Sequence, residues 1–281
     1  MNPTIALLTD FGTTDIYVGI AKAVILNICS SANIIDLTHN IQTANVRQAA
    51  LALLHSYAYF PPQTIFTVVV DPGVGSARRV ILARAGWYSF VAPDNGVLSY
   101  ALDGLKDVQM VEMTNAAYRL PQMSNTAHGR DVFAPAAAFL AAGVELEKFG
   151  PALRDPVILP EPELHISGKW ITGEVLNIDS YGNVLTSIGD LRWGAPGRLT
   201  LNPRFGGSAP AIPIPADEAV VGACGHTITG IHRLYSDAAR GEMVAVVGAL
   251  GYLELAINQG NCAARLDVSI GDPITLQIGK E

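Results

Sequence analysis

Three short polar segments of this 281-residue chain carry side chains that can move protons and hold charge. Asp10 follows the apolar run near the start of the chain, and Asp71 and Arg78 lie in a segment that reads DPGVGSAR. His128 lies in a segment that reads HGRD. Carboxylates, an imidazole and a guanidinium are the groups with which proteins carry out acid–base chemistry and stabilise developing charge.

Each segment also has an ordinary structural explanation. Asp10 and Asp15 could be a turn residue and a helix cap, and Asp71-Pro-Gly is a common turn composition. A lone histidine such as His128 is more often structural than catalytic. Two of the segments follow strand-like runs and the third precedes an Ala-rich helix. Because ligands of open α/β sheets bind beyond the carboxyl ends of the strands, we expect the three segments to converge on one edge of a sheet.

The first 150 residues alternate between strand-like and helix-like runs, which predicts an α/β domain with a mostly parallel sheet. The expected strands cover residues 5–8, 33–37, 64–70, 80–85, 88–92 and 108–113. The expected helices cover residues 16–28, 45–56 and 131–142. In the first helix, spacing places Ile16, Ile20 and Val24 near one face.

The sequence changes character near Gly150. Residues 151–166 are rich in proline, which predicts a stiff, extended linker. Beyond it, β-like runs are separated by Gly, Asn and Asp turns, so residues 167–281 are expected to form an all-β, barrel-like domain. The runs that we expect as strands are 169–178, 198–201, 243–248, 252–257 and 274–278.

Composition excludes several classes of protein. The chain has 18 Lys+Arg against 25 Asp+Glu and no basic run, so nucleic acid and acidic membranes are not expected partners. No apolar stretch is long enough to span a bilayer, the first residues do not resemble a signal peptide, and we expect a cytoplasmic protein. The low charged fraction of 15% suggests a surface partly covered by partner subunits.

Several common site motifs are missing from the sequence. There is no GxxxxGK[ST] phosphate loop, no GxSxG elbow, and no complete glycine pattern for a dinucleotide. Cys224, His226 and His232 could be imagined as a metal site, but three soft ligands in a glycine-rich β context fit loop residues better. The expectation is therefore a protein with no metal and no cofactor.

Six segments resemble the S-adenosyl-L-methionine (SAM) hydroxide adenosyltransferases, the relatives of the bacterial fluorinase and chlorinase. They run in order along nearly the whole chain and read LLTDFGTTD (7–15), VVVDPGVGSARR (68–79), VAPDNGVLS (91–99), AHGRDVFAPAAA (127–138), DSYGNVLTSI (179–188) and GYLELAINQGNCAA (251–264). The resemblance implies a three-layer α/β N-terminal domain and a C-terminal β-barrel. It also implies a homotrimer whose substrate site lies at the subunit interface, between one subunit's N-terminal domain and its neighbour's C-terminal domain.

The resemblance assigns roles position by position. Asp71, Arg78 and His128 match the triad beside the attacking water. Asp10 matches the carboxylate that holds the ribose hydroxyls, and Asp15 the group that meets the methionine amine.

The remaining roles fall in the C-terminal half. Asn183 matches an amide that contacts adenine, and Tyr181 in the same Tyr-Gly-Asn segment is included as a substrate-binding residue. Tyr235 matches an aromatic ring that stacks on adenine. Relatives usually have Asn-Ser followed by a polar or small residue where this chain has Gly-Ala-Leu at 248–250, so how the methionine carboxylate is held stays open.

The implied reaction is attack of water on the 5′ carbon of SAM, which releases adenosine and L-methionine. Halogenating relatives have Tyr in place of Asp71 and Ser or Gly in place of His128, and the fluorinase has an inserted loop after the strand expected at 80–85. Three alternatives stay open: a chloride-dependent 5′-halo-adenosine synthase, a calcium-dependent nucleoside hydrolase, and a SAM- or adenosine-binding sensor without catalysis. Which of Asp71 and His128 would take the proton is also open.

Overall fold

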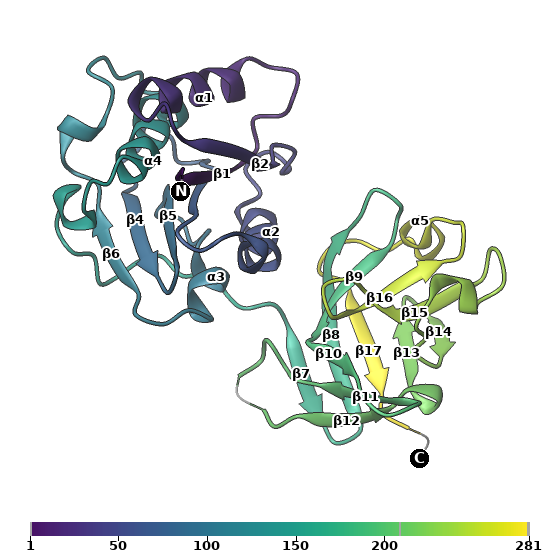
Figure 1. The fold of residues 1–281 in the computed structure, drawn as a ribbon. Helices are drawn as coiled ribbons and strands as arrows, with labels where there is room; N and C mark the ends of the chain where they lie inside the picture. The colour runs from purple at the N-terminus through teal and green to yellow at the C-terminus, as the bar shows by residue number, and fades with distance from the viewer. Residues whose placement is uncertain (1, 208, 280–281) are drawn as a thin grey trace. The chain divides into compact units, whose positions relative to one another are not determined.

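The computed structural model describes residues 2–207 and 209–279. Its internal contacts divide the chain into two compact units, Met1–Leu159 and Pro160–Glu281 (Figure 1). The boundary falls within the proline-rich segment, and residues up to Leu159 make their contacts with the first unit. Within the described residues, no helix combines the length and the apolar character needed to cross a membrane.

The first unit contains a six-stranded sheet in the order β2-β1-β3-β5-β4-β6. Its strands are β1 (Thr4–Thr9), β2 (Asn33–Thr38), β3 (Ile65–Val69), β4 (Val80–Ala85), β5 (Tyr88–Pro93) and β6 (Gln109–Glu112). The β1–β2, β1–β3 and β3–β5 pairs are parallel, whereas β4 is antiparallel to both β5 and β6. The mostly parallel sheet predicted from the alternating runs is therefore confirmed.

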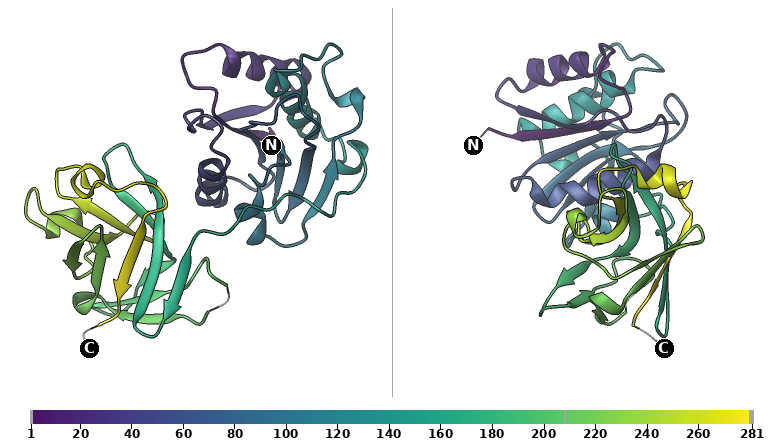
Figure 2. Two further views of the ribbon diagram at one scale, coloured as in Figure 1. Left: turned by 180° about the vertical axis from the view of Figure 1, so that it is seen from behind. Right: turned by 90° about the vertical axis from the view of Figure 1, so that its right-hand side faces the viewer.

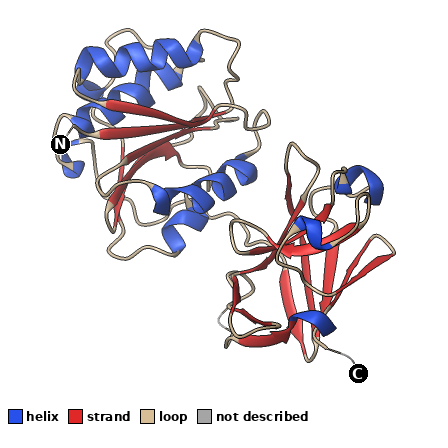
Figure 3. Cartoon of the chain, turned by 45° about the vertical axis from the view of Figure 1, so that its right-hand side comes forward, coloured by secondary structure: helices blue, strands red, loops and turns tan. Residues whose placement is uncertain are grey.

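Helices cover both faces of this sheet and complete a three-layer unit (Figure 3). Figure 1 shows α1 (Tyr17–Ile28) and α4 (Ala134–Ala141) over one face, and α2 (Val46–Ser56) and α3 (Ser99–Asp103) over the other. Asn45 caps α2 by accepting a hydrogen bond from the backbone N–H of Gln48, as its residue type favours. Short 3-10 turns lie at Tyr57–Tyr59, Ala116–Tyr118 and Leu146–Lys148.

The buried face of α1 matches the predicted one in part. Ala21 and Ile25 are its buried residues, and Val24 of the predicted face packs against the same core. Ile16, by contrast, precedes the helix and is 71% exposed. α1 also packs against α4, a contact that spacing within the helix does not indicate.

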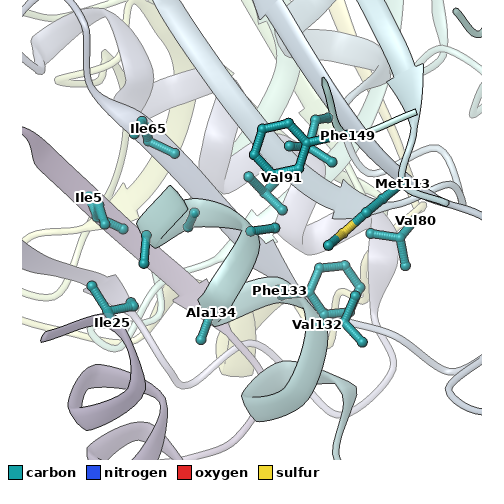
Figure 4. Close-up of a cluster of buried hydrophobic side chains, with 14 of the residues drawn as sticks. Ile5, Ile25, Ile65, Val80, Val91, Met113, Val132, Phe133, Ala134 and Phe149 are labelled. Carbon is teal, nitrogen blue, oxygen red and sulfur yellow. The ribbon is translucent and has the colours of Figure 1, made fainter. Parts of the chain in front are cut away.

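The core under α1 and α4 is built from alternate residues of the sheet. Figure 4 shows Ile5, Ile65 and Val91 from neighbouring strands facing Phe133 and Ala134. Burial of these side chains supplies the main stabilising term, since each large apolar side chain contributes about 1.5–3 kcal/mol when it is removed from water. The core fixes the segment that follows His128, because Val132 and Phe133 are almost completely buried.

The second unit is mostly β-structure, as predicted. Its eight-stranded sheet runs in the order β14-β13-β17-β8-β9-β16-β15, with β7 added beside β8. An isolated bridge between His232 and Val246 brings the segment after β14 to β15, so the antiparallel sheet is nearly closed (Figure 2). These strands are β7 (Leu164–Ser167), β8 (Trp170–Ile178), β9 (Val184–Gly189), β13 (Val220–Ala223), β14 (His226–Thr229), β15 (Met243–Val247), β16 (Tyr252–Ile257) and β17 (Pro273–Gln277).

Smaller elements complete the second unit. A three-stranded sheet contains β10 (Leu191–Trp193), β11 (Arg198–Leu201) and β12 (Ile212–Pro215). A short helix, α5 (Cys262–Leu266), follows β16, and 3-10 turns lie at Ala216–Glu218 (η5) and Tyr235–Asp237 (η6).

Candidate active site

Two of the three polar segments leave the sheet side by side. β1 and β3 are parallel neighbours, and Thr9 pairs with Val69 at their carboxyl ends. Asp10 follows the first strand directly, and Asp71 follows the second after one intervening residue. The order of the strands thus brings both carboxylates to the edge of the sheet where α/β proteins bind ligands.

Arg78 joins the second and third segments into one cluster. Its Nε lies 3.0 and 2.9 Å from the two carboxylate oxygens of Asp71, and its Nη2 also donates to Oδ2. The same Nη2 lies 2.7 Å from Nδ1 of His128. The side chains of Asp71 and Arg78 are only 6% and 12% exposed. The structure therefore brings the three residues together as a largely buried, hydrogen-bonded set.

The contact with Arg78 defines the state of the His128 ring. Arginine can only donate, so Nδ1 must be the accepting nitrogen and a neutral ring carries its proton on Nε2. Burial lowers the pKa of His128, and the positive charge of Arg78 lowers it further against the opposing effect of Asp71 and Asp131. His128 is therefore neutral at pH 7, with an N–H directed from Nε2.

A short π-helical turn at Gly129–Phe133 (η3) positions His128. His128 caps this turn, and α4 begins directly after it. The helix predicted over 131–142 is observed as this π-helical turn followed by α4, so helical structure begins two residues earlier and ends one residue earlier than predicted. The ring of Phe133 lies beneath the Arg78 guanidinium at 5.4 Å, in a cation–π contact. Such π-turns occur frequently at functional sites.

Asp131 is a fully buried carboxylate that the sequence reasoning did not single out. It accepts hydrogen bonds from the Arg130 side chain at 2.5 and 2.9 Å and from the backbone N–H of Ser124 at 2.7 Å. Burial would raise the pKa of Asp131, but these bonds outweigh burial and lower it. Asp131 therefore holds the loop that leads into His128. In the sequence, its position in the HGRD segment, three residues after His128, is the feature that points to Asp131 as part of this site.

Two glycines let the loops of the site approach one another closely. A Cβ on Gly75 would lie 2.5 Å from the carbonyl oxygen of Asn125, and the positive φ of +77° also favours glycine. A Cβ on Gly129 would lie 2.7 Å from the ring of Phe11. These contacts bring the segments of Asp71 and Asp10 against the segment of His128.

The Asp10 loop is fixed by backbone and side-chain hydrogen bonds. Asp10 Oδ2 accepts from the backbone N–H of Ala44 at 2.9 Å, and Ala44 has a positive φ of 63°. The His39 ring bonds Thr9 at 2.9 Å, and the His39 carbonyl accepts from Gly12 N at 2.7 Å. Asp15 lies exposed in the following loop. Asp10 is therefore held in place through its Oδ2.

The PDNG segment after β5 supports the same edge of the sheet. Asn95 donates to the carbonyl of Val70 at 2.9 Å, directly before Asp71. Asp94 accepts from Arg79 at 2.7 Å and from the backbone N–H of Val157 at 2.8 Å. Asn95 and Asp94 therefore support the two ends of the segment from Asp71 to Arg79, through contacts that sequence spacing does not indicate.

In the second unit, Asn183 and Tyr181 lie in the turn between β8 and β9. Asp179 organises this turn by accepting from the backbone N–H groups of both residues and from the Asn183 side chain at 2.9 Å. The Tyr181 ring is 77% exposed. The turn thus presents an aromatic ring and an amide on the surface of the unit.

Tyr235 lies in η6 and its ring is 45% exposed. Its hydroxyl donates to Oε1 of Glu254 on β16 at 2.6 Å. Burial and the neighbouring Glu254 raise the pKa of Tyr235, so the hydroxyl stays protonated and remains a donor. Glu254 was not singled out from the sequence, where it is one residue of the GYLELA segment.

The metal-site alternative at Cys224, His226 and His232 receives no support from the geometry. Over residues 2–207 and 209–279, His, Cys, Asp and Glu side chains do not gather in threes as a metal site would require. His226 instead makes a 3.2 Å contact with the carbonyl of Cys224.

Comparisons with known proteins identify both units. Residues 5–150 match the SAM hydroxide adenosyltransferase N-terminal domain, and residues 173–275 match the C-terminal domain of the same family. The two matches cover most of the chain, in agreement with the resemblance seen in the six sequence segments.

The chain is 36% identical over 281 residues to an (R)-S-adenosyl-L-methionine hydrolase of Salinispora arenicola, covering 99% of this chain and 98% of that protein. It is 27% identical over 310 residues to a fluorinase of an Actinoplanes species, covering 98% and 97%. A crystal structure of an uncharacterized conserved protein from Thermotoga maritima superposes with a TM-score of 0.83 at 33% identity, covering 97% of this chain and 99% of that one. The chain therefore belongs to the SAM hydroxide adenosyltransferase family.

Proposed function

We propose that this protein hydrolyses SAM to adenosine and L-methionine, by attack of water on the ribose 5′ carbon. The observation that carries the proposal is the buried Asp71–Arg78–His128 cluster, found in a chain that matches hydrolases of this kind over its full length. The nucleophile needs help because bulk water is a weak acid, whereas the leaving thioether is neutral and needs no proton.

The tautomer of His128 indicates which residue orients the attacking water and which accepts its proton. With Nδ1 occupied by Arg78, the Nε2–H of His128 can donate to the water oxygen and orient it. Asp71 retains lone pairs beyond those used by Arg78 and can accept the proton. As the C–O bond forms, the water becomes a protonated alcohol, which is a strong acid, so even a weakly basic carboxylate is sufficient. We therefore assign Asp71 as the proton acceptor and His128 as the residue that orients the water.

Substrate binding is proposed for the residues that present free polar or aromatic groups. Asp10 would accept from the ribose hydroxyls, and Asp15 would meet the methionine ammonium. Asn183 would contact adenine with its amide, and Tyr181 and Tyr235 would contact it with their rings. The exposure of Tyr181 and Tyr235, and the position of Asp10 at the carboxyl end of β1, support this assignment.

We further propose a homotrimer in which the site is completed by a neighbouring subunit. Both units expose apolar side chains near their site residues: Ile16, Tyr17 and Met123 in the first, and Leu234 and Leu250 in the second. Apolar groups of this kind at a rim favour burial against a partner surface. A covered site would also exclude water other than the nucleophile and so limit side reactions of the bound substrate.

A mixing experiment tests the shared site. Two variants are used. Asp71→Asn disables the half of the site in the first unit, and the double variant Asn183→Ala with Tyr235→Ala disables the half in the second unit. If the site is shared, refolded mixtures contain intact sites in about a quarter of random pairings and recover that share of activity. If each site is built within one chain, the mixture stays as inactive as its components.

We propose that the reaction needs no metal or cofactor and takes place in the cytoplasm. The leaving group is a neutral thioether, so no Lewis acid is needed to stabilise it. This supports a reaction without a metal. The three cysteines are unpaired, as is usual in reducing compartments.

One incubation separates the proposed activity from its rivals. The protein is incubated with SAM in metal-free buffer, with and without chloride and EDTA, and the nucleosides are separated and identified by mass. Adenosine and methionine in all buffers support the hydrolase. A chloride-dependent 5′-chloro-adenosine would identify a halogenating enzyme, as the fluorinase relative makes conceivable. EDTA inhibition would indicate metal dependence, and binding of SAM without any product would indicate a sensor.

A further inference from the structure

Glu254 is a partly buried carboxylate that no step of the proposed reaction uses. It lies on β16, and its Oε1 accepts the 2.6 Å hydrogen bond from the hydroxyl of Tyr235. The hydroxyl of the tyrosine is therefore bonded to a strand of its own unit, while the residue as a whole stays 45% exposed. A ring held in this way has lost most of its rotational freedom before any ligand arrives.

The backbone around Tyr235 is fixed separately. Asp237 accepts hydrogen bonds from the backbone N–H groups of Arg233 and Leu234, at 3.2 and 3.1 Å, and so closes the η6 turn. These bonds place the Cα of Tyr235 but leave its two side-chain torsions undetermined. The bond to Glu254 fixes the position of the hydroxyl and so restricts both torsions.

Gly248 provides the space for the Glu254 carboxylate. A Cβ at position 248 would lie 2.5 Å from Oε2 of Glu254, so any larger residue would push the carboxylate away. Burial raises the pKa of Glu254, and the hydrogen bond from Tyr235 counteracts this effect. The two side chains thus support each other: the carboxylate orients the phenol, and the phenol helps to keep the carboxylate charged.

We propose that Glu254 is a positioning residue for substrate binding, which holds Tyr235 so that its ring forms a preformed wall for the adenine of SAM. The inference rests on the proposed function, in which Tyr235 contacts adenine. Because the hydroxyl donates to Glu254, the contribution of Tyr235 to binding comes from the face of its ring. Preorganisation of this kind increases affinity by removing the cost of ordering the side chain on binding.

A double-mutant cycle tests this role. Glu254→Ala and Tyr235→Phe are each expected to raise KM for SAM about 3- to 10-fold and to leave kcat within about 2-fold. The double variant should be no worse than either single variant, because both remove the same bond. Glu254→Gln keeps an accepting oxygen and should remain close to the unchanged protein. Glu242→Ala, which removes an exposed carboxylate that precedes β15, is the matched control.

Adenosine binding measured by calorimetry gives a second readout that does not depend on turnover. Its Kd should rise in Glu254→Ala, in Tyr235→Phe and in Gly248→Ala, which displaces the carboxylate without removing it. Additive effects in the cycle, or an unchanged adenosine Kd in Glu254→Ala, would overturn the proposal. If the unchanged protein binds adenosine but does not hydrolyse SAM, the proposed function fails while this experiment still decides the role of Glu254.

Discussion

Nη2 of Arg78 lies 2.7 Å from Nδ1 of His128, although the two residues are fifty positions apart in the chain. This contact holds only while the ring nitrogen is an acceptor. Protonation of His128 would place two donors and two positive charges against each other. The geometry therefore favours the neutral ring, the form that the proposed mechanism uses.

The first prediction concerns the pH dependence of activity. Since burial and Arg78 lower the pKa of His128, the rate of SAM hydrolysis should be constant through pH 7 and fall only below the usual histidine value of about 6.5. His128→Asn keeps an acceptor for Arg78 but cannot titrate in this range. The residual activity of this variant should therefore not decrease below about pH 6.5 in the way expected for the unchanged protein. A profile that falls through pH 7 or above would contradict the assignment.

The lowered pKa of His128 also predicts that the stability of the fold depends on pH. Below about pH 6.5 the unfolded chain binds a proton at His128 that the folded protein still excludes. The free energy of unfolding should therefore decrease as the pH falls from this value through the lower pKa of the folded state. Denaturant unfolding at several pH values measures the slope, and His128→Asn should reduce it.

The second prediction concerns Asp71. Asp71→Asn should lower kcat about 10²- to 10⁴-fold, because the proton acceptor is lost while the shape of the side chain is kept. SAM binding, measured by calorimetry, should be mostly retained. Asp155→Asn is a suitable control, since Asp155 is an 83% exposed partner of the adjacent Arg79. Turnover at the unchanged rate in Asp71→Asn would remove Asp71 from the mechanism.

The third prediction separates backbone strain from close contact at Gly75. Gly75→Ala introduces a positive φ for alanine and a clash with the carbonyl of Asn125, whereas Gly143→Ala introduces only the unfavourable φ. The first variant should therefore be less stable than the second by about 1–3 kcal/mol in thermal or denaturant unfolding. It should also lower kcat, because the displaced loop leads into His128. Equal losses in the two variants would show that the loops can separate freely.

The fourth prediction concerns Asp131. Asp131→Ala removes the acceptor of Ser124 N and of the Arg130 side chain, and should lower the free energy of unfolding by about 1–3 kcal/mol. The loop between residues 121 and 128 should then exchange its amide hydrogens faster than the rest of the first unit. Unchanged exchange in this loop would contradict the anchoring role.

The sequence predicted the layered first unit and the β-rich second unit because their patterns differ over long stretches. The first unit shows alternating strand-like and helix-like runs, and the second shows turn residues at short spacing. Both patterns are local, so they can be recognised without knowing which residues are in contact. The edge of the sheet was also predictable, since Asp10 and Asp71 follow strongly apolar strands.

Features that depend on packing between distant segments were not predictable. The contact of α1 with α4, more than a hundred residues later, is one such feature, and the exposure of Ile16, which precedes α1, is another. The π-turn after His128 has no pattern of its own in HGRDVF. Asp131, Asn95 and Glu254 each act by accepting or donating across the fold, and sequence spacing alone does not indicate such contacts.

Arg78 and Arg79 are adjacent, yet they pair with carboxylates of different segments: Asp71 for the first, and Asp94 and Asp155 for the second. Because both arginines lie directly before β4, both pairings require the same alignment of that strand. A shift of one residue between β4 and β5 would displace both arginines, and would disrupt the proposed reaction centre and the path of the chain beyond Pro151 together. Insertions should therefore be tolerated at the Gly86-Trp87 turn of this hairpin and excluded between Asp71 and Val80.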